Sequence, residues 1–271
     1  MSEASTAAGG AVGAGATPTV LDRARPADIR RDPFPHLVVR DALPAAVYDR
    51  LAATRPDSDT VAWAGPKPSN IRLPLSARRI LDHPAIDPAW KAFVAAHAAP
   101  AFLARVLDLF AEVWPDLPPD PAALARAGTT LLDVTGMPDG EPGDGRVHLD
   151  ARLELNTPVT GGESRVRGPH VDTANRLYSG LFYLRAADDP TPGGDLVLYR
   201  WRGGAVRDPL RYEIPDAEVE AVARVPYAAN TLVLFPNHPH ALHGVTARPP
   251  TPHERAYVFL TAEVVAHRFG A

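Results

Sequence analysis

The run VHLDARLELN, at residues 147–156, alternates apolar and polar residues without interruption. A two-residue period of this kind is typical of a β-strand that packs one face against a core. Further strand-like runs follow, bounded by Gly- and Pro-rich segments, at residues 180–184, 195–200, 218–227, 231–235 and 255–265. Many short strands joined by turns indicate an antiparallel jelly roll, in which two sheets cover each other's faces.

The residues before about 131 show the period of helices instead. Leu43, Val47 and Leu51 predict a helix that begins at Pro44, where the missing N–H of proline costs nothing. A second helical region covers residues 87–114 and is divided at Pro100. The predicted fold class is mainly β with N-terminal helices: a helical support at about residues 40–130 and a jelly-roll core at about residues 131–271.

The first 19 residues are mostly small, and such a segment is expected to form a disordered tail. Residues 20–271 are expected to form a single domain, since that length supports one well-buried core. A run of roughly 20 apolar residues, as a membrane span requires, is absent, and the start of the chain lacks signal-peptide features. A cytoplasmic protein with no membrane partner is expected.

The charge and the cysteine count exclude further classes. A net charge of −4 argues against a nucleic-acid partner, which would need a strongly basic surface, and favours a small-molecule substrate. The chain has no cysteine, so disulfides, thiolate zinc sites and cysteine nucleophiles are excluded, and any metal must be held by nitrogen and oxygen. The oligomeric state is not determined by the sequence.

The segment GPHVDTANRLYSGLFYL, at residues 168–184, places His170 two residues before Asp172. Residues i and i+2 of an extended chain point to the same side, so an imidazole and a carboxylate would share one space. A lone pair of this kind is also common at the exposed end of a strand. The pattern therefore needs a further ligand elsewhere in the chain before it indicates a metal site.

That ligand is available in LVLFPNHPHALHGVTARPPTPHERAYVFL, which carries four histidines. Two histidines and one carboxylate with open positions suit non-haem Fe(II), although zinc also accepts such a set. His243 precedes GVT, where the chain can become extended, whereas His240 lies in a Pro-containing turn. We therefore favour His170, Asp172 and His243 as catalytic metal ligands, with His240 as the alternative to His243.

Arg255 follows His243 by twelve residues and begins a strand-like run in which it shares one face with Tyr257, Phe259 and Thr261. The planar guanidinium fork of arginine binds a carboxylate through two parallel hydrogen bonds. A dicarboxylate co-substrate could then chelate a metal at one end and bind Arg255 at the other.

The motifs GPHVD, SGLFYL, GGDLVLY, NTLVLFPN and HGV, followed by Arg255, resemble in this order the Fe(II)/2-oxoglutarate-dependent oxygenase superfamily, particularly its prolyl-4-hydroxylase-like branch. The resemblance covers about residues 131–265 and extends more weakly to DPFPHLVVRDALP near the N-terminus. It implies a double-stranded β-helix (cupin-like) core that uses Fe(II), 2-oxoglutarate and O2. Position by position, it implies iron on His170, Asp172 and His243, and the distal carboxylate of 2-oxoglutarate on Arg255.

Tyr183 matches a position where relatives direct a tyrosine hydroxyl toward that same carboxylate. Relatives often carry another tyrosine on the strand before the metal motif, but LELNTPVTGG has none. We expect Asn156, Thr157 or water in its place.

The resemblance implies a dioxygenase that oxidises a substrate while 2-oxoglutarate loses CO2 to give succinate. Because related halogenases lack the metal-binding carboxylate, the retained Asp172 favours hydroxylation. We expect hydroxylation of an unactivated C–H bond in a small molecule: an amino acid, a natural-product intermediate or a sugar derivative. The alternatives are a peptidyl hydroxylase that acts on a protein, and a non-catalytic metal-binding jelly-roll sensor, for which the co-substrate anchor Arg255 would be unnecessary.

Residues on either side of the metal motif are the candidates for substrate binding. Arg167 lies just before it, together with Arg165, and the loop just after it carries Asn175, Arg176 and Tyr178. We expect Arg167, Asn175, Arg176 and Tyr178 to face the iron.

Overall fold

The computed structural model describes residues 16–132 and 146–270, so most of the tail expected at residues 1–19 lies outside the described residues. The helices are α1 (Ala45–Ala53), α2 (Ser58–Val61), α3 (Ala77–Asp82), α4 (Pro88–His97), α5 (Pro100–Leu109) and α6 (Pro121–Arg126), with short 3-10 turns η1 (Pro26–Asp28), η2 (Ala111–Val113) and η3 (Asp216–Glu218). The strands are β1 (Leu37–Arg40), β2 (Arg72–Leu75), β3 (Gly128–Leu131), β4 (Arg146–Asn156), β5 (Arg176–Tyr183), β6 (Leu196–Trp201), β7 (Val219–Val225), β8 (Thr231–Pro236), β9 (His243–Val245) and β10 (Arg255–Glu263).

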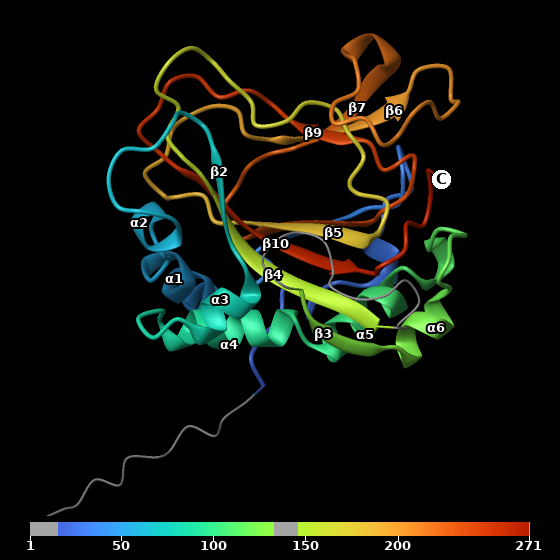
Figure 1. Ribbon diagram of the computed structural model, residues 1–271, viewed down its shortest axis with the longest axis horizontal. Coiled ribbons are helices and arrows are strands. Elements are labelled where there is room, and N and C mark those ends of the chain that lie inside the picture. The colour runs from blue at the N-terminus through green and yellow to red at the C-terminus, as the bar shows by residue number, and fades with distance from the viewer. Residues whose placement is uncertain (1–15, 133–145, 271) are drawn as a thin grey trace, which may run out of the picture.

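The strands form two sheets, and the fold is mainly β. The main sheet has seven strands in the order β1-β8-β5-β10-β4-β2, with β3 pairing in parallel with β4. The small sheet has the order β7-β6-β9. In Figure 1 the small sheet lies above the main sheet, and the helices cover the opposite face of the main sheet. The molecule therefore has three layers, with the main sheet in the middle.

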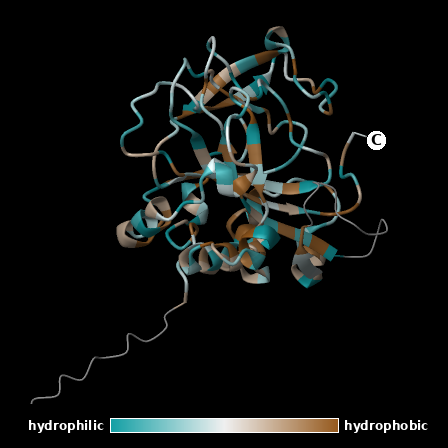
Figure 2. Ribbon diagram, turned by 60° about the vertical axis from the view of Figure 1, so that its left-hand side comes forward, coloured by the Kyte–Doolittle hydropathy of each residue, from teal (hydrophilic) through white to brown (hydrophobic). Residues whose placement is uncertain are grey.

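Two apolar clusters hold these layers together. The larger cluster joins the helices to the main sheet and includes Trp90 and Phe93 of α4 and Leu153 of β4. The smaller one lies between the two sheets and includes Leu181 of β5 and Leu196 of β6. Figure 2 shows hydrophobic residues concentrated in the strands and in the helices that pack beneath them.

Short polar residues or prolines stand at the N-termini of the helices. Asp57, Ser76 and Asp120 each accept a hydrogen bond from a backbone N–H in the first turn of the helix that follows, which satisfies a group the helix itself leaves free. Pro44 was predicted as the first residue of α1, but it lies one position earlier and its carbonyl accepts from Tyr48 N at 3.0 Å.

The break predicted at Pro100 separates α4 from α5. Both are mostly apolar on the face toward the main sheet, where Val94 and Val106 are fully buried. Within the described ranges no helix is by itself long and apolar enough to cross a membrane, and only α4 and α5 together, bent by 51°, pass that test.

Strand β4 shows the alternation read from its sequence, but both of its faces are buried rather than one. Val147, Leu149 and Leu153 pack on the helices, while Asp150 and Glu154 point to the interior between the sheets and are each 1 % exposed. Arg152 lies between these two carboxylates, with its Nε 3.2 Å from Asp150 and 3.7 Å from Glu154, and their mutual pairing is what allows the charges to be buried.

Strand β5 begins at Arg176, four residues before the predicted start at residue 180. Its first residue pairs with Glu263 of β10, and the register shifts next to this pair. Arg176 and Tyr178, which were expected in a loop, are therefore strand residues. This difference changes where both side chains point.

Candidate functional site

His170, Asp172 and His243 meet between the two sheets. One ligand atom from each lies within 4.8 Å of the others, and the three residues are 7 %, 6 % and 5 % exposed. Asp172 Oδ1 lies 3.6 Å from His170 Nε2, and Asp172 Oδ2 lies 3.6 Å from His243 Nε2. The structure thus brings together the three side chains that the sequence analysis favoured, whereas His240 is exposed.

The backbone orients both imidazoles in the same way. His170 Nδ1 is 2.8 Å from the carbonyl of Gly168, and His243 Nδ1 is 2.9 Å from the carbonyl of Ala241. A carbonyl can only accept, so each Nδ1 carries the proton and each Nε2 presents a lone pair toward Asp172. This fixed tautomer is the one that a metal ligand requires.

Asp172 is held in place through both of its oxygens. Arg176 Nη1 forms an ion pair with Oδ1 at 3.0 Å, and the hydroxyl of Ser179 donates to Oδ2. Burial alone would raise the pKa of Asp172, but Arg176 and the two neighbouring imidazoles hold it well below its usual range. Asp172 is therefore a carboxylate at neutral pH.

His243 is neutral over the same range. Burial is the main cause that lowers its pKa to about 3, and the adjacent His170 lowers it further, whereas Asp172 raises it. A neutral imidazole and an ionised carboxylate are the forms that bind metal, so the site needs no proton release by these groups before a cation binds.

Arg255 lies in the same cavity as the triad and is 3 % exposed. Its Nε donates to the carbonyl of Gly194 at 2.9 Å, and its guanidinium lies 4.8 to 5.4 Å from the ring centres of Tyr183, Tyr227 and Tyr257. No carboxylate pairs with Arg255 among the described residues, and its Nη2 makes no hydrogen bond there. A buried cation without a counter-charge is costly, so this one indicates an anionic ligand.

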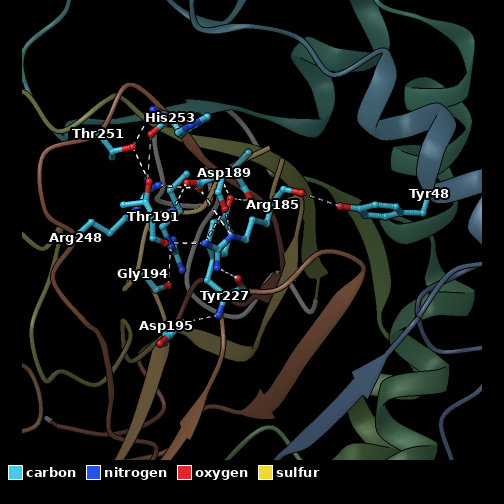
Figure 3. Close-up of polar contacts among 12 residues, drawn as sticks. Tyr48, Arg185, Asp189, Thr191, Gly194, Asp195, Tyr227, Arg248, Thr251 and His253 are labelled. Carbon is cyan, nitrogen blue, oxygen red and sulfur yellow. Dashed lines mark hydrogen bonds and ion pairs between the residues drawn. The ribbon is translucent and has the colours of Figure 1, made fainter. Parts of the chain in front are cut away.

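Two other arginines near this end of the cavity, the buried Arg248 and the part-buried Arg185, are already bound within the protein, as Figure 3 shows. Arg248 Nη2 pairs with Asp189 Oδ2 at 2.9 Å. Arg185 donates to the carbonyls of Asp189, Thr191 and Tyr227. Arg255 is therefore the arginine of the three that is free to bind a carboxylate.

Two further buried polar atoms support this reading. Within the described parts of the chain, neither the Tyr183 hydroxyl nor Asn156 Nδ2 has a hydrogen-bond partner. Asn156 lines the cavity, with its Oδ1 3.4 Å from Arg255 Nη1. Thr157, the alternative considered from the sequence, is occupied, since it donates to the Pro68 carbonyl and accepts from Ile71 N.

The cavity that joins the triad to Arg255 has a volume of about 50 Å³. Leu181, Leu196, Val245 and Phe259 form its apolar wall. The predicted face of β10 is correct for Arg255, Tyr257 and Phe259, which all line it. A space this narrow between apolar side chains excludes most of the water.

The structure divides the expected substrate residues. Arg167 lines the cavity. Tyr178 is fully buried on the opposite face of β5, among the residues that contact the helices. Asn175 donates to Glu263, and Arg176 bridges Asp172 and Glu263. Arg176 and Tyr178 differ from the expectation because β5 begins at Arg176, so neither lies in a loop beside the triad.

Two further residues at the site, Arg72 and Ser179, were not predicted from the sequence. Arg72 lies on β2, directly opposite Asn156 of β4, and lines the cavity. The β2 segment RLPL is short and contains a proline, so no strand was predicted there. Ser179 could have been found from the alternation along β5, which places it on the same face as Leu181.

No protein-family model and no curated protein matches the chain. Several solved structures resemble it. One is a prolyl 4-hydroxylase from Pseudomonas putida (15 % identity, 84 % of this chain and 92 % of that one, TM-score 0.44). Another is HygX from Streptomyces hygroscopicus with nickel and 2-oxoglutarate bound (14 % identity, 84 % and 82 %, TM-score 0.41).

A third is SnoN, a non-haem α-ketoglutarate-dependent epimerase from nogalamycin biosynthesis (14 % identity, 87 % and 81 %, TM-score 0.41). Prolyl 4-hydroxylase and 2-oxoglutarate-binding proteins are thus among the structures that the chain resembles. The function proposed below depends on the geometry of the site.

Proposed function

We propose that this protein is an Fe(II)- and 2-oxoglutarate-dependent dioxygenase with a double-stranded β-helix core, and that it hydroxylates an unactivated C–H bond of a small molecule. The observation that carries this proposal is one narrow cavity with two chemically distinct ends. The first end holds His170, Asp172 and His243, and the second holds the buried, unpaired guanidinium of Arg255.

The donor set fits Fe(II). Two imidazole nitrogens and one carboxylate leave three positions of an octahedral ion for other ligands. His170 and His243 would each bind through Nε2, and Asp172 through a carboxylate that Arg176 and Ser179 keep ionised and oriented. Fe(II) with 2-oxoglutarate and O2 supplies the oxidising chemistry, in which 2-oxoglutarate becomes succinate and CO2 and a substrate C–H bond becomes C–OH.

The opposite end of the cavity fits the distal carboxylate of 2-oxoglutarate. Arg255 would bind it through the free side of its fork, and the unpartnered Tyr183 hydroxyl and Asn156 Nδ2 are further donors. Burial raises the pKa of Tyr183, so its hydroxyl keeps the proton it would donate. The three tyrosine rings around Arg255 hold its guanidinium plane while leaving those donors available.

Gly194 makes room for this arrangement. A Cβ at this position would lie 3.1 Å from Cδ and Nε of Arg255 and 3.2 Å from Cδ of Arg248, and its φ of +76° is one that other residues rarely adopt. The second glycine of the GGDLVLY motif thus has a direct physical reason. It lets the backbone approach Arg255 closely enough for the Gly194 carbonyl to accept from Nε.

The apolar wall formed by Leu181, Leu196, Val245 and Phe259 suits an oxidation. Water is kept from the reacting centre, and the electrostatic interactions of the charged groups are strengthened by the low dielectric. The triad is more than nine-tenths buried, so the substrate has to insert a small group toward the metal. This favours a small molecule, and a single protein side chain is the alternative.

The proposal is tested without knowledge of the substrate. Under anaerobic conditions, Fe(II) and 2-oxoglutarate added to the metal-free protein should give the weak visible charge-transfer band of a chelated keto acid. Admission of O2 should bleach the band while succinate accumulates. His243→Ala should give no band, whereas His240→Ala, which changes an exposed histidine of the same loop, should behave as wild type.

One result would overturn the proposal, and another would overturn its choice of third ligand. Absence of the band in the wild type would favour the non-catalytic metal-binding protein, and metal analysis would show whether zinc is held instead. A band that survives His243→Ala and disappears with His240→Ala would mean that the third ligand is wrongly assigned.

A further inference from the structure

A second cationic group lies in the cavity, separate from Arg255. The arginines that line the cavity are Arg72, Arg167 and Arg255, and the acidic residue that lines it is Asp172. If the proposed function is right, a metal dication and the 2-oxoglutarate dianion cancel each other. Arg255 then binds 2-oxoglutarate and Asp172 binds the metal, so the positive charge of Arg72 and Arg167 remains.

Arg167 is held as a binding group rather than as half of an internal ion pair. Its Nε donates to the carbonyl of Tyr212 at 2.7 Å, and its guanidinium lies 4.7 Å from the centre of the Tyr212 ring. Across residues 16–132 and 146–270, no carboxylate pairs with it, and no hydrogen bond uses its two terminal nitrogens. One edge of the guanidinium is therefore fixed by the protein, while the other edge is available.

Arg72 adds a second positive charge next to the same space. Its side chain is 49 % exposed, and its Nε lies 3.6 Å from Glu154 Oε2. Glu154 is shared with Arg152, whose Nε is 3.7 Å from the other oxygen, so a single carboxylate serves two arginines. The charge of Arg72 is thus only partly neutralised by Glu154, and it can attract an anionic ligand that enters from the solvent side.

The electrostatic state of Arg167 agrees with this geometry. Burial is the main cause that lowers its pKa, and Arg72 and Arg176 lower it further, whereas Asp172 and Tyr212 raise it. An arginine held half-buried beside other cations is relieved by an anion. Asp172 is not that anion, because it forms no ion pair with Arg167 and its charge already faces Arg176 and, in the proposed function, the metal.

We propose that the primary substrate carries an oxyanion, a carboxylate or a phosphate or sulfate group, which docks on Arg167 with Arg72 beside it. This inference rests on the proposed function only in saying that the bound molecule is the substrate of an oxidation at the triad. The bound oxyanion would fix one end of the substrate at the solvent side of the cavity and direct a C–H bond of the other end toward the triad. Neutral sugars and cationic amines are disfavoured as substrates.

The test uses the anaerobic protein with Fe(II) and saturating 2-oxoglutarate, so that Arg255 is occupied. Sulfate, as a tetrahedral oxyanion, and acetate, as a planar one, are titrated separately by calorimetry at constant ionic strength, with methylammonium as the cationic control. We expect at least one oxyanion to bind with a 1:1 isotherm, and methylammonium not to bind. The preferred anion distinguishes a phosphorylated or sulfated substrate from a carboxylated one.

Three variants assign the anion to this position. Arg167→Gln should weaken binding by about tenfold or more, because a charge-assisted fork is lost. Arg72→Gln should weaken it by about threefold, as expected for a half-exposed charge. Arg165→Gln is the matched control, since Arg165 lies two residues away and is paired with Glu213 at 2.6 Å, and it should bind as wild type.

The proposal is wrong if neither oxyanion binds the wild type, if methylammonium binds instead, or if Arg167→Gln binds as tightly as wild type. Circular dichroism and the midpoint of thermal unfolding verify that each variant is folded. The charge-transfer band, recorded on the same samples, reports the proposed function separately. Oxyanion binding that depends on Arg167 without a band would overturn the dioxygenase function and leave the anion site standing.

Discussion

The backbones of His170 and His243 exchange two hydrogen bonds: His170 N donates to the His243 carbonyl at 2.8 Å, and His243 N donates to the His170 carbonyl at 2.9 Å. This antiparallel bridge brings two distant parts of the chain to the same point, and their ring centres lie 4.2 Å apart. The backbone therefore positions the two imidazoles independently of any metal. The site is pre-organised, which reduces the cost of binding a cation.

Replacing Arg255 with alanine should weaken 2-oxoglutarate binding while Fe(II) still binds. Loss of a buried charge-assisted contact costs roughly 2 to 5 kcal/mol, which corresponds to about 30-fold to several thousand-fold in Kd. The concentration of 2-oxoglutarate that gives half of the charge-transfer band measures this. Arg50→Ala, which changes an exposed arginine of α1 that is paired with Asp87, is the control and should leave the value unchanged. Equal affinity in Arg255→Ala would place the anchor elsewhere.

Gly194→Ala should weaken 2-oxoglutarate binding because the added Cβ pushes on Arg255. The φ of +76° also makes any other residue strained there. Gly203→Ala is a matched control, since Gly203 has φ +79° but open space around the position of its Cβ. Both variants should lose about 1 kcal/mol of stability from backbone strain.

Only Gly194→Ala should also raise the 2-oxoglutarate Kd, and Fe(II) binding should persist in both variants. A denaturant titration and the charge-transfer band measure the two effects. If both variants bound 2-oxoglutarate equally well, contact between Gly194 and Arg255 would have no role in affinity.

Arg176→Ala should destabilise the fold strongly at pH 7, although Arg176 is not a metal ligand. It would leave Asp172 and Glu263 buried without the guanidinium that bridges them, and breaking a buried pair on one side costs about 3 to 5 kcal/mol. Urea unfolding of the metal-free protein measures this loss. Arg50→Ala, which breaks a surface pair with Asp87, should cost less than about 1 kcal/mol. Similar losses in both would mean that Arg176 is solvated.

The stability of the protein should fall between pH 6.5 and pH 4 in a way that depends on His97. Its Nδ1 donates to the Phe93 carbonyl and its Nε2 accepts from Val20 N, so the buried imidazole has no room for a second proton. Burial is the main cause that lowers the pKa of His97 from 6.5 to about 4, whereas the Phe93 bond and Asp22 raise it.

Between these pH values the unfolded chain binds more protons than the folded protein, so protonation favours unfolding. The full contribution is present above pH 6.5, and about 3 kcal/mol is lost by pH 4. Urea midpoints at several pH values should show a shallower decline in His97→Gln than in wild type. The exposed His267→Gln should keep the wild-type slope, and parallel curves for all three proteins would contradict this assignment.

Local alternation in the sequence was sufficient to place Arg255, Tyr257 and Phe259 on one face of β10, and extended chain after His243 favoured that histidine over His240. These features are determined within a few residues. The triad could be predicted because few residues in the chain have side chains that bind metal, and their order along the sequence left few combinations. Arg255 could be predicted from its position after His243. That its Nη2 has no partner among the described residues is known only from the structure.

Other features could not be predicted, because they depend on which strands become neighbours. The polar face of β4 looks solvated in the sequence, and only the second sheet above it makes it interior. Arg176 and Tyr178 changed role because β5 pairs with β10 from Arg176 onward. Arg72 enters the cavity because β2 pairs with the end of β4. Each of these facts depends on long-range pairing.

The proposed metal site lies at a junction between the two sheets. His243 belongs to β9 of the small sheet and is bridged to His170, whereas Asp172 is held by Ser179 and Arg176 of β5 in the main sheet. A cation bound by all three side chains would therefore cross-link the two layers. Opening the sandwich at this edge and releasing the metal would then be the same event, so metal occupancy would set how long the two sheets stay together there.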